Sequence, residues 1–138
     1  MGERTCRVVR PGERVGTLQG LESFVGVSRE SAGARGLCLH LIVLPPGARA
    51  RPHLHRDHET ALYALAGRVG MWFGDGLEEY VETGPGDFLY IPPNTPHQPF
   101  NLSDSEPATA VAARTDPDEQ ESVVLLPHLD ALHAPGAR

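Results

Sequence analysis

Apolar residues in this chain come in short runs separated by turns rich in Gly and Pro. The longest run, 37–44, ends at Pro45-Pro46-Gly47, and at that length a buried strand is favoured over a helix. Further strands are expected at 21–27, 48–55, 60–66, 68–73, 77–82, 88–91 and 108–113. Short strands at intervals of about 8–12 residues predict an all-β sandwich or barrel, and no segment has a convincing helical period.

Two further segments refine this expectation. Gly74-Asp75-Gly76 is a strong hairpin signal, so the strands on either side of it should pair. The apolar segment 123–126 should pack back on the barrel or on a second subunit. Because exposed sheet edges need covering, we also expect a homodimer.

Length and charge exclude several classes of protein. The 138 residues predict one domain, and a net charge of −6 without a basic run argues against a nucleic-acid-binding surface. No apolar stretch approaches the roughly 20 residues of a membrane span, and the N-terminus lacks an apolar signal region. Cys6 and Cys38 form no metal or redox motif, so they are interpreted as reduced thiols of a cytoplasmic protein.

The basic residues are all arginine. Together with the many Ala, Gly and Pro residues, the absence of lysine suggests a GC-rich bacterial genome. It also excludes any chemistry that needs a Schiff-base lysine.

Histidines gather in one short stretch. His53 and His55 are two positions apart, so on an extended strand both imidazoles point to the same face, and Glu59 follows closely. Two neutral imidazole nitrogens and a carboxylate oxygen on one face make a site for a divalent transition metal. His97 comes after a turn rich in Pro and Asn and offers one more ligand.

These two stretches resemble the motifs of the cupin family. The first family motif has Gly, five residues, His-x-His, three or four residues, Glu, six residues and Gly; the chain has Gly47, His53, His55, Glu59 and Gly67. The second has Gly, five residues, Pro-x-Gly, two residues, His, three residues and Asn. Here the corresponding residues are Gly86, Pro92, Asn94 in place of Gly, His97 and Asn101.

The resemblance implies a single-domain cupin-type antiparallel β-barrel, or jelly roll, with a metal inside. The barrel would occupy about 35–115, with N-terminal edge strands in 1–30 and a C-terminal packing tail at 116–138. Asn94 is a mild departure, because Asn tolerates the left-handed turn conformation best after Gly.

The resemblance carries over four metal ligands: His53, His55, Glu59 and His97. Seven residues, rather than six, separate Glu59 from Gly67. Either a one-residue bulge absorbs the offset, or the register counts back from Gly67 and puts Thr60 at the carboxylate position. In the second alternative, the metal is bound either by the three histidines alone or by these histidines and His58. Glu59 is preferred, since the family uses a carboxylate and its spacing from His55 is allowed.

Three imidazoles and one carboxylate suit one divalent ion of Fe, Mn, Zn, Ni or Co, with open positions for water, O2 or substrate. The resemblance therefore implies a metal-dependent enzyme acting on a small organic molecule, as an oxygenase or as an isomerase, cyclase or lyase. The alternative is a non-catalytic, metal-containing barrel that binds a small molecule.

Three further residues are candidates for the pocket. By strand parity, Arg51 and Arg49 share the face of His53 and His55, where a guanidinium would anchor an acidic or enolisable substrate; the alternative is solvated charge at the rim. Tyr63 fits the barrel core or a dimer face, and would be a proton donor if its phenol lined the pocket.

Overall fold

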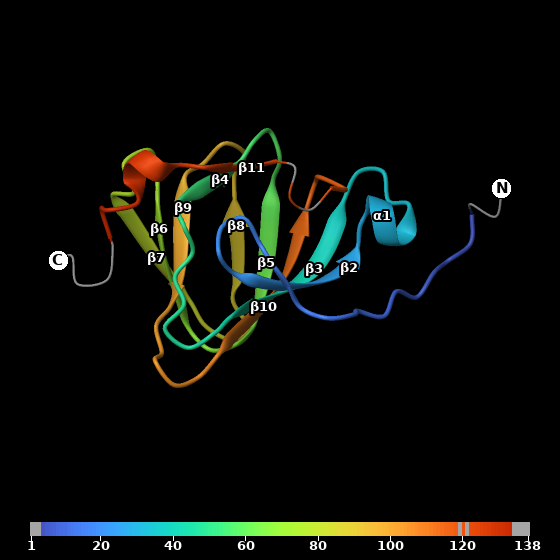
Figure 1. Ribbon diagram of the computed structural model, residues 1–138, viewed down its shortest axis with the longest axis horizontal. Helices are drawn as coiled ribbons and strands as arrows, with labels where there is room; N and C mark the ends of the chain where they lie inside the picture. Colours follow the sequence, from blue (N-terminus) through green and yellow to red (C-terminus); the bar gives the residue numbers. More distant parts are fainter. Residues whose placement is uncertain (1–3, 119, 121, 134–138) are drawn as a thin grey trace.

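The computed structural model of the protein describes residues 4–118, 120 and 122–133. Their strands form two antiparallel sheets (Figure 1). The six-stranded sheet has the order β1 (Val15–Gly16), β2 (Glu22–Val27), β3 (Cys38–Leu44), β10 (Ala108–Arg114), β5 (Thr60–Ala66) and β8 (Phe88–Ile91). The five-stranded sheet has the order β11 (Val123–Leu125), β4 (His53–His55), β9 (His97–Asn101), β6 (Val69–Phe73) and β7 (Glu79–Thr83).

The all-β barrel that the sequence predicts is therefore the observed fold. In the described residues the helices are only a single turn, α1 (Arg29–Ala32), and a 3-10 turn, η1 (Pro127–Leu129). Helix α1 lies between the strands expected at 21–27 and 37–44, where Ser28 caps it and Gly33 ends it with a φ of 73°. The described residues contain no helix with the length and apolar character that a membrane crossing requires.

Strands β3, β10 and β5 form the middle of the six-stranded sheet. The apolar run of β3 lies between β2 and β10, and β10 pairs on its other side with β5. Along β5 the side chains alternate, so that Thr60, Leu62 and Ala64 face the interior while Tyr63 and Leu65 face outward. The interior between the sheets is therefore walled by alternate residues of each strand.

The turn at Gly67 shows why the barrel needs glycine there. Gly67 has a φ of 78°, and a Cβ built on it would lie 2.7 Å from the Ala108 Cα. Both the left-handed backbone and the close approach of β10 exclude a side chain at this position. Asn94 likewise adopts a φ of 60°, and its side-chain Oδ1 accepts a hydrogen bond from the Asp57 backbone N–H. This bond ties the turn before β9 to the turn after β4.

Two predicted segments differ from the structure. The strand expected over 48–55 is regular only at His53–His55, because Pro52 has no N–H to donate to a ladder; upstream of it, Arg49 forms an isolated bridge to Phe100. The segment 97–101, which is not among the expected strands, is strand β9. It pairs with β6 along its length and meets β4 at His53–His97.

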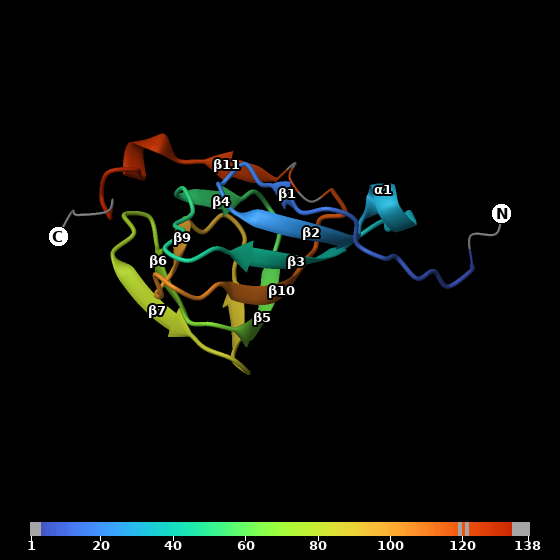
Figure 2. The ribbon, with the colours of Figure 1, turned by 60° about the horizontal axis from the view of Figure 1, so that its bottom comes forward.

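The predicted hairpin at 74–76 joins β6 and β7, which pair in register. The apolar segment 123–126 packs back on the barrel as β11, which pairs with β4 in antiparallel register (Figure 2). The barrel strand that carries two histidines therefore has β11 along one edge.

Candidate metal centre

Three buried histidines meet between β4 and β9. His53 and His55 alternate with Leu54 on β4, so both imidazoles point inward, and His97 is the cross-strand partner of His53. The ring centroids of His53 and His97 are 4.2 Å apart. One ligand atom from each of the three residues lies within 4.8 Å of the others. The sequence predicted these three residues as ligands, and the structure brings them together.

Each imidazole is oriented by a contact on its far side. The Nδ1 of His53 lies 2.7 Å from the Arg51 carbonyl oxygen, and the Nδ1 of His97 lies 2.9 Å from the Thr95 carbonyl oxygen. The Nδ1 of His55 lies 3.4 Å from the Ser122 hydroxyl. A carbonyl only accepts, so Nδ1 of His53 and His97 carries the proton, which leaves Nε2 with a lone pair. Metal-ligating histidines have this arrangement, so the donor set fits a transition metal.

Burial also favours the neutral imidazole. Burial lowers the pKa of His97 to about 4. Burial, followed by the neighbouring His97, lowers the pKa of His53 well below 6.5, and burial followed by the charge of Arg114 lowers that of His55. The three side chains are therefore neutral near pH 7, which is the form that binds a metal.

The structure does not bring Glu59 or His58 into this cluster. Glu59 is exposed, and its Oε1 accepts a hydrogen bond from the Tyr90 hydroxyl at 2.8 Å. The His58 Nε2 lies 3.9 Å from Asp116 Oδ2. Both residues precede β5, where the chain turns at Asp57 with a φ of 62°. Their side chains consequently point away from the interior.

Thr60 stands where the second register reading placed it. It is the first residue of β5, it is buried, and its side chain lines the same cavity as the histidines. Its Oγ1 accepts a hydrogen bond at 3.0 Å from Nε of Arg114, its register partner on β10. A buried hydroxyl and a guanidinium thus lie beside the histidines, at the position where the family motif has a carboxylate.

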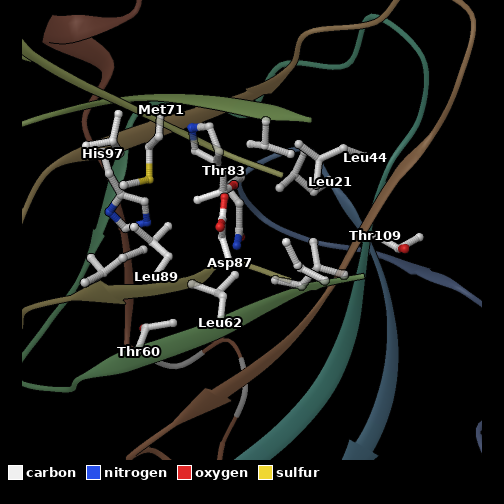
Figure 3. A pocket seen from close by; sticks show the side chains of 18 of the residues that line it. Leu21, Leu44, Thr60, Leu62, Met71, Thr83, Asp87, Leu89, His97 and Thr109 are labelled. Carbon is white, nitrogen blue, oxygen red and sulfur yellow. The ribbon is translucent and has the colours of Figure 1, made fainter. Parts of the chain in front are cut away.

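A cavity of about 80 Å³ runs between the sheets from the histidines. In Figure 3, His97 and Met71 lie at one side, Leu21 and Leu44 at the other, and Thr83 and Asp87 between them. Most of the wall is aliphatic, and its polar residues besides the histidines are Gln19, Thr60, Thr83, Asp87, Thr109 and Arg114. Ligand pockets for drug-sized molecules are several hundred Å³, so this cavity suits a much smaller molecule.

The three pocket candidates lie outside this cavity. The Arg49 guanidinium covers the Phe100 ring at 4.9 Å and donates a hydrogen bond to the His133 carbonyl oxygen. Arg51 is exposed, because it precedes Pro52 and the parity of β4 does not extend to it. Tyr63 faces outward from the six-stranded sheet and packs on Phe88 with ring centroids 4.8 Å apart.

Comparison with known proteins agrees with the barrel fold. A family model described as the cupin domain matches residues 40–114, more than half of the 138-residue chain. The chain belongs to the cupin family. Both histidine-bearing strands and the Thr60–Arg114 pair fall within the matched residues.

Each match to an individual relative of this cupin covers only part of this chain and part of the relative. Quercetin 2,3-dioxygenase of Bacillus subtilis is 43% identical over 53 residues, which are 38% of this chain and 15% of the relative. An uncharacterized protein of Methanocaldococcus jannaschii is 37% identical over 60 residues, 44% of this chain and 46% of the relative. The cupin chain therefore spans less than half the length of either relative.

Solved structures share the fold at low identity. An oxalate decarboxylase variant from Bacillus subtilis superimposes with a TM-score of 0.67 at 23% identity, over 85% of this chain and 30% of that one. Peruvianin-I from Thevetia peruviana latex superimposes with a TM-score of 0.67 at 22% identity, over 83% of this chain and 74% of that one. These similarities establish the cupin fold.

Sequence reasoning missed three residues of the cavity. Arg114 is 54 positions from Thr60 along the chain, and only the pairing of β10 with β5 places them together. Gln19 is buried, and its Oε1 has no hydrogen-bond partner among the described residues. Asp87 lines the cavity while its Oδ2 accepts a hydrogen bond from the Gly84 N–H. The sequence offered one indication of this part of the cavity: the spacing of Thr60 from Gly67, which predicts that the Thr60 side chain faces inward.

Proposed function

We propose that this cupin is a metal-dependent enzyme that acts on a small organic molecule, with His53, His55 and His97 as the protein ligands of one divalent transition metal. The observation that carries the proposal is the convergence of three buried imidazoles, each held by a contact at Nδ1, on a cavity. Such a donor set suits Fe, Mn, Zn, Ni or Co.

A bound metal would supply Lewis acidity or a site for O2, because three protein ligands leave coordination positions open. The chain's own residues provide the rest of the site. The aliphatic wall of the cavity excludes bulk water, and the Nδ1 contacts hold the imidazoles in place. The cavity volume of about 80 Å³ restricts the substrate to a small molecule.

The relatives support oxygenase or lyase chemistry. The quercetin 2,3-dioxygenase of Bacillus subtilis is by name an oxygenase, and the oxalate decarboxylase of the same organism is described as having Mn(II) centres. A fold shared by several chemistries does not select one reaction. We therefore propose the class of enzyme, with isomerase and cyclase chemistry as further members of that class.

Metal content of anaerobically purified protein tests the centre. Elemental analysis should give about one equivalent in the wild type and none in His97→Ala, because removing one of three ligands leaves too few. His128→Ala is the matched control, since His128 is exposed on η1. Metal should also persist in Glu59→Ala. Absence of metal from every preparation, even after reconstitution, would overturn the proposal.

A second measurement separates the enzyme from a non-catalytic binding barrel. In a Mn(II)-loaded protein, replacing the solvent with 17O-labelled water should broaden the electron paramagnetic resonance lines, because exchangeable water is bound to the ion. A spectrum with no exchangeable water would indicate a closed, structural metal and would favour the binding barrel over the enzyme.

We also propose that the chain forms a homodimer through the outer face of the six-stranded sheet. Phe88 is 80% exposed and Tyr90 56% exposed, and both lie on this face with Tyr63, Leu65 and Leu39. Light scattering after size exclusion should give a dimer for the wild type and a monomer for Phe88→Ser. The control Leu132→Ser alters an exposed leucine elsewhere and should remain dimeric. A monomeric wild type would refute the dimer.

A further inference from the structure

One buried amide in the wall of the cavity lacks a hydrogen-bond partner. Gln19 lines the cavity and is only 5% exposed, and its Oε1 accepts no hydrogen bond from residues 4–118, 120 or 122–133. By contrast, Thr60 Oγ1 and Asp87 Oδ2, in the same wall, accept hydrogen bonds from Arg114 and from the Gly84 N–H. Buried acceptors in folded proteins pair with protein groups, with ordered water or with a ligand.

The turn that carries Gln19 is held by its own hydrogen bonds. The N–H of Gly20 donates to the Thr17 carbonyl oxygen at 3.0 Å, and the N–H of Leu21 donates to Thr17 Oγ1 at 3.0 Å. The Gln19 carbonyl oxygen accepts the Arg51 N–H at 2.7 Å, which ties the turn to the segment before β4. The backbone of Gln19 is therefore positioned without any help from its side-chain amide.

The wall that Gln19 shares is mainly aliphatic. Leu21 and Leu44 line the cavity, and both belong with Ala50 and Ala108 to the hydrophobic core. In Figure 3 these leucines lie on the side of the cavity away from His97. A hydrogen bond formed in such surroundings is stronger than in water, and a polar group left unpaired there is costly.

A second buried glutamine has a structural role instead. The Oε1 of Gln98 also lacks a partner in the part of the chain that the structure describes, but its Nε2 donates to the Ala50 carbonyl oxygen at 3.0 Å. On β9 it lies between His97 and Pro99, which both line the cavity. By strand alternation Gln98 faces away from the cavity, so a ligand there does not meet it.

An unpaired acceptor that destabilises the fold is understandable at a site where a ligand supplies the donor. We propose that Gln19 accepts a hydrogen bond from the small molecule that enters the cavity, so that the substrate carries an O–H or N–H group, as an alcohol or an amide does. The substrate class rests on the proposed function, whereas the contact with Gln19 does not require the metal. Such a site rejects an analogue without the donor, because the buried acceptor then stays unpaired.

Acetamide and acetone are matched probes, because they have the same arrangement of heavy atoms and differ only in an NH2 group in place of a methyl group. Each is titrated into metal-free protein while the methyl resonances of Leu21 and Leu44, in the cavity wall, are followed by NMR. Acetamide should shift them saturably and bind about tenfold more tightly than acetone. Equal binding of the two, or no saturable shift with either, would overturn the inference.

Gln19→Met keeps the length of the side chain and removes the acceptor. In this variant acetone should bind more tightly than acetamide, because the NH2 group would enter an aliphatic wall without a partner. Gln98→Met is the matched control and should retain the preference for acetamide. A preference for acetamide that persists in Gln19→Met would assign the donor to another polar residue of the wall and refute the role of Gln19.

Thermal melting without any probe checks that the amide is free of a structural role. Gln19→Met should not lower the melting temperature, since an apolar group replaces an unpaired polar one, whereas Gln98→Met should lower it by removing the hydrogen bond to Ala50. A Gln19→Met chain that fails to fold, or that melts below the wild type, would show that the fold already uses the amide and would overturn the inference.

Comparing metal-free with Zn(II)-loaded protein separates this inference from the proposed function. The preference for acetamide should appear in both forms, because Gln19 is present in both. Wild-type protein that never binds metal but keeps the preference would refute the metal centre and leave the role of Gln19 intact. Protein that binds metal and shows no preference in either form would refute the role of Gln19 and leave the metal centre intact.

Discussion

Asn101, the last residue of the second family motif, should stabilise the fold through hydrogen bonds that need a neutral amide side chain. Its Nδ2 lies near three carbonyl oxygens, of Leu44 at 3.0 Å, Pro45 at 3.2 Å and Glu106 at 2.8 Å. Its Oδ1 accepts the Ser103 N–H at 2.9 Å. These partners fix the amide orientation, and they tie the end of β3 to the loop between β9 and β10.

Asn101→Ala removes two N–H donors and one acceptor from a side chain that is only 6% exposed. Each buried group left unsatisfied costs about 1–3 kcal/mol, and some relaxation is expected, so the free energy of unfolding should fall by about 3–4 kcal/mol. This is a large part of the roughly 5–15 kcal/mol typical of a domain. Urea denaturation followed by Trp72 fluorescence measures it.

Asn101→Asp keeps the shape and makes the prediction sharper. A carboxylate there faces three carbonyl oxygens with no proton to donate, so at pH 7 this variant should be less stable than Asn101→Ala. Protonation restores one donor, and the difference between the two variants should shrink toward pH 5. An Asp variant as stable as the wild type at pH 7, or an Ala variant within about 1 kcal/mol of it, would refute the reasoning.

Other predictions concern acid, the Gly67 turn and the orientation of His55. Burial lowers the pKa of His40 from 6.5 to about 4. The unfolded chain thus binds a proton that the folded chain does not, so as the pH falls from 6.5 to 4 His40 alone should cost metal-free protein about 3 kcal/mol, in addition to the loss from the three buried histidines of the centre. Urea titrations should show this loss, less of it in His40→Gln, and a flat profile would contradict it. Gly67→Ala should lower the unfolding free energy by about 3 kcal/mol, whereas Gly12→Ala, with nothing within 4 Å of its Cβ, should change it little. Ser122→Ala should weaken metal binding up to about tenfold in a chelator competition, since it removes the 3.4 Å contact to His55 Nδ1; unchanged affinity would mean that this contact does not orient the ring.

Local patterns predicted much of the barrel. The limits of β5 and β8 agree with the expected ones, because alternating or apolar residues there are bounded by Gly and Pro. The inward direction of His53 and His55 follows from strand parity alone. The hairpin at Gly74 is equally local, since Gly74 adopts a φ of 99° in the turn between the strands that it joins.

Long-range pairing determined what the sequence left open. Spacing allowed both a bulge that brings Glu59 inward and a register that brings Thr60 inward, and the pairing of buried Thr60 with Arg114 and Ile91 distinguishes them. The parity argument for Arg51 was wrong about direction because Pro52 interrupts the strand. Arg114 carried no local signal, since its partner belongs to a strand distant in sequence.

Strand β11 has a consequence for the rate at which metal exchanges. It pairs with β4 at Val123–His55 and Leu125–His53, whereas β4 meets β9 only at His53–His97. A three-residue strand at a sheet edge is an element that opens locally at a small fraction of the cost of global unfolding. Detachment of β11 would free β4 and its two imidazoles while the rest of the barrel stays folded. The rate of ion release should then follow the rate of amide hydrogen exchange in 123–125. A partner that binds this strand would therefore slow ion release without contacting a ligand.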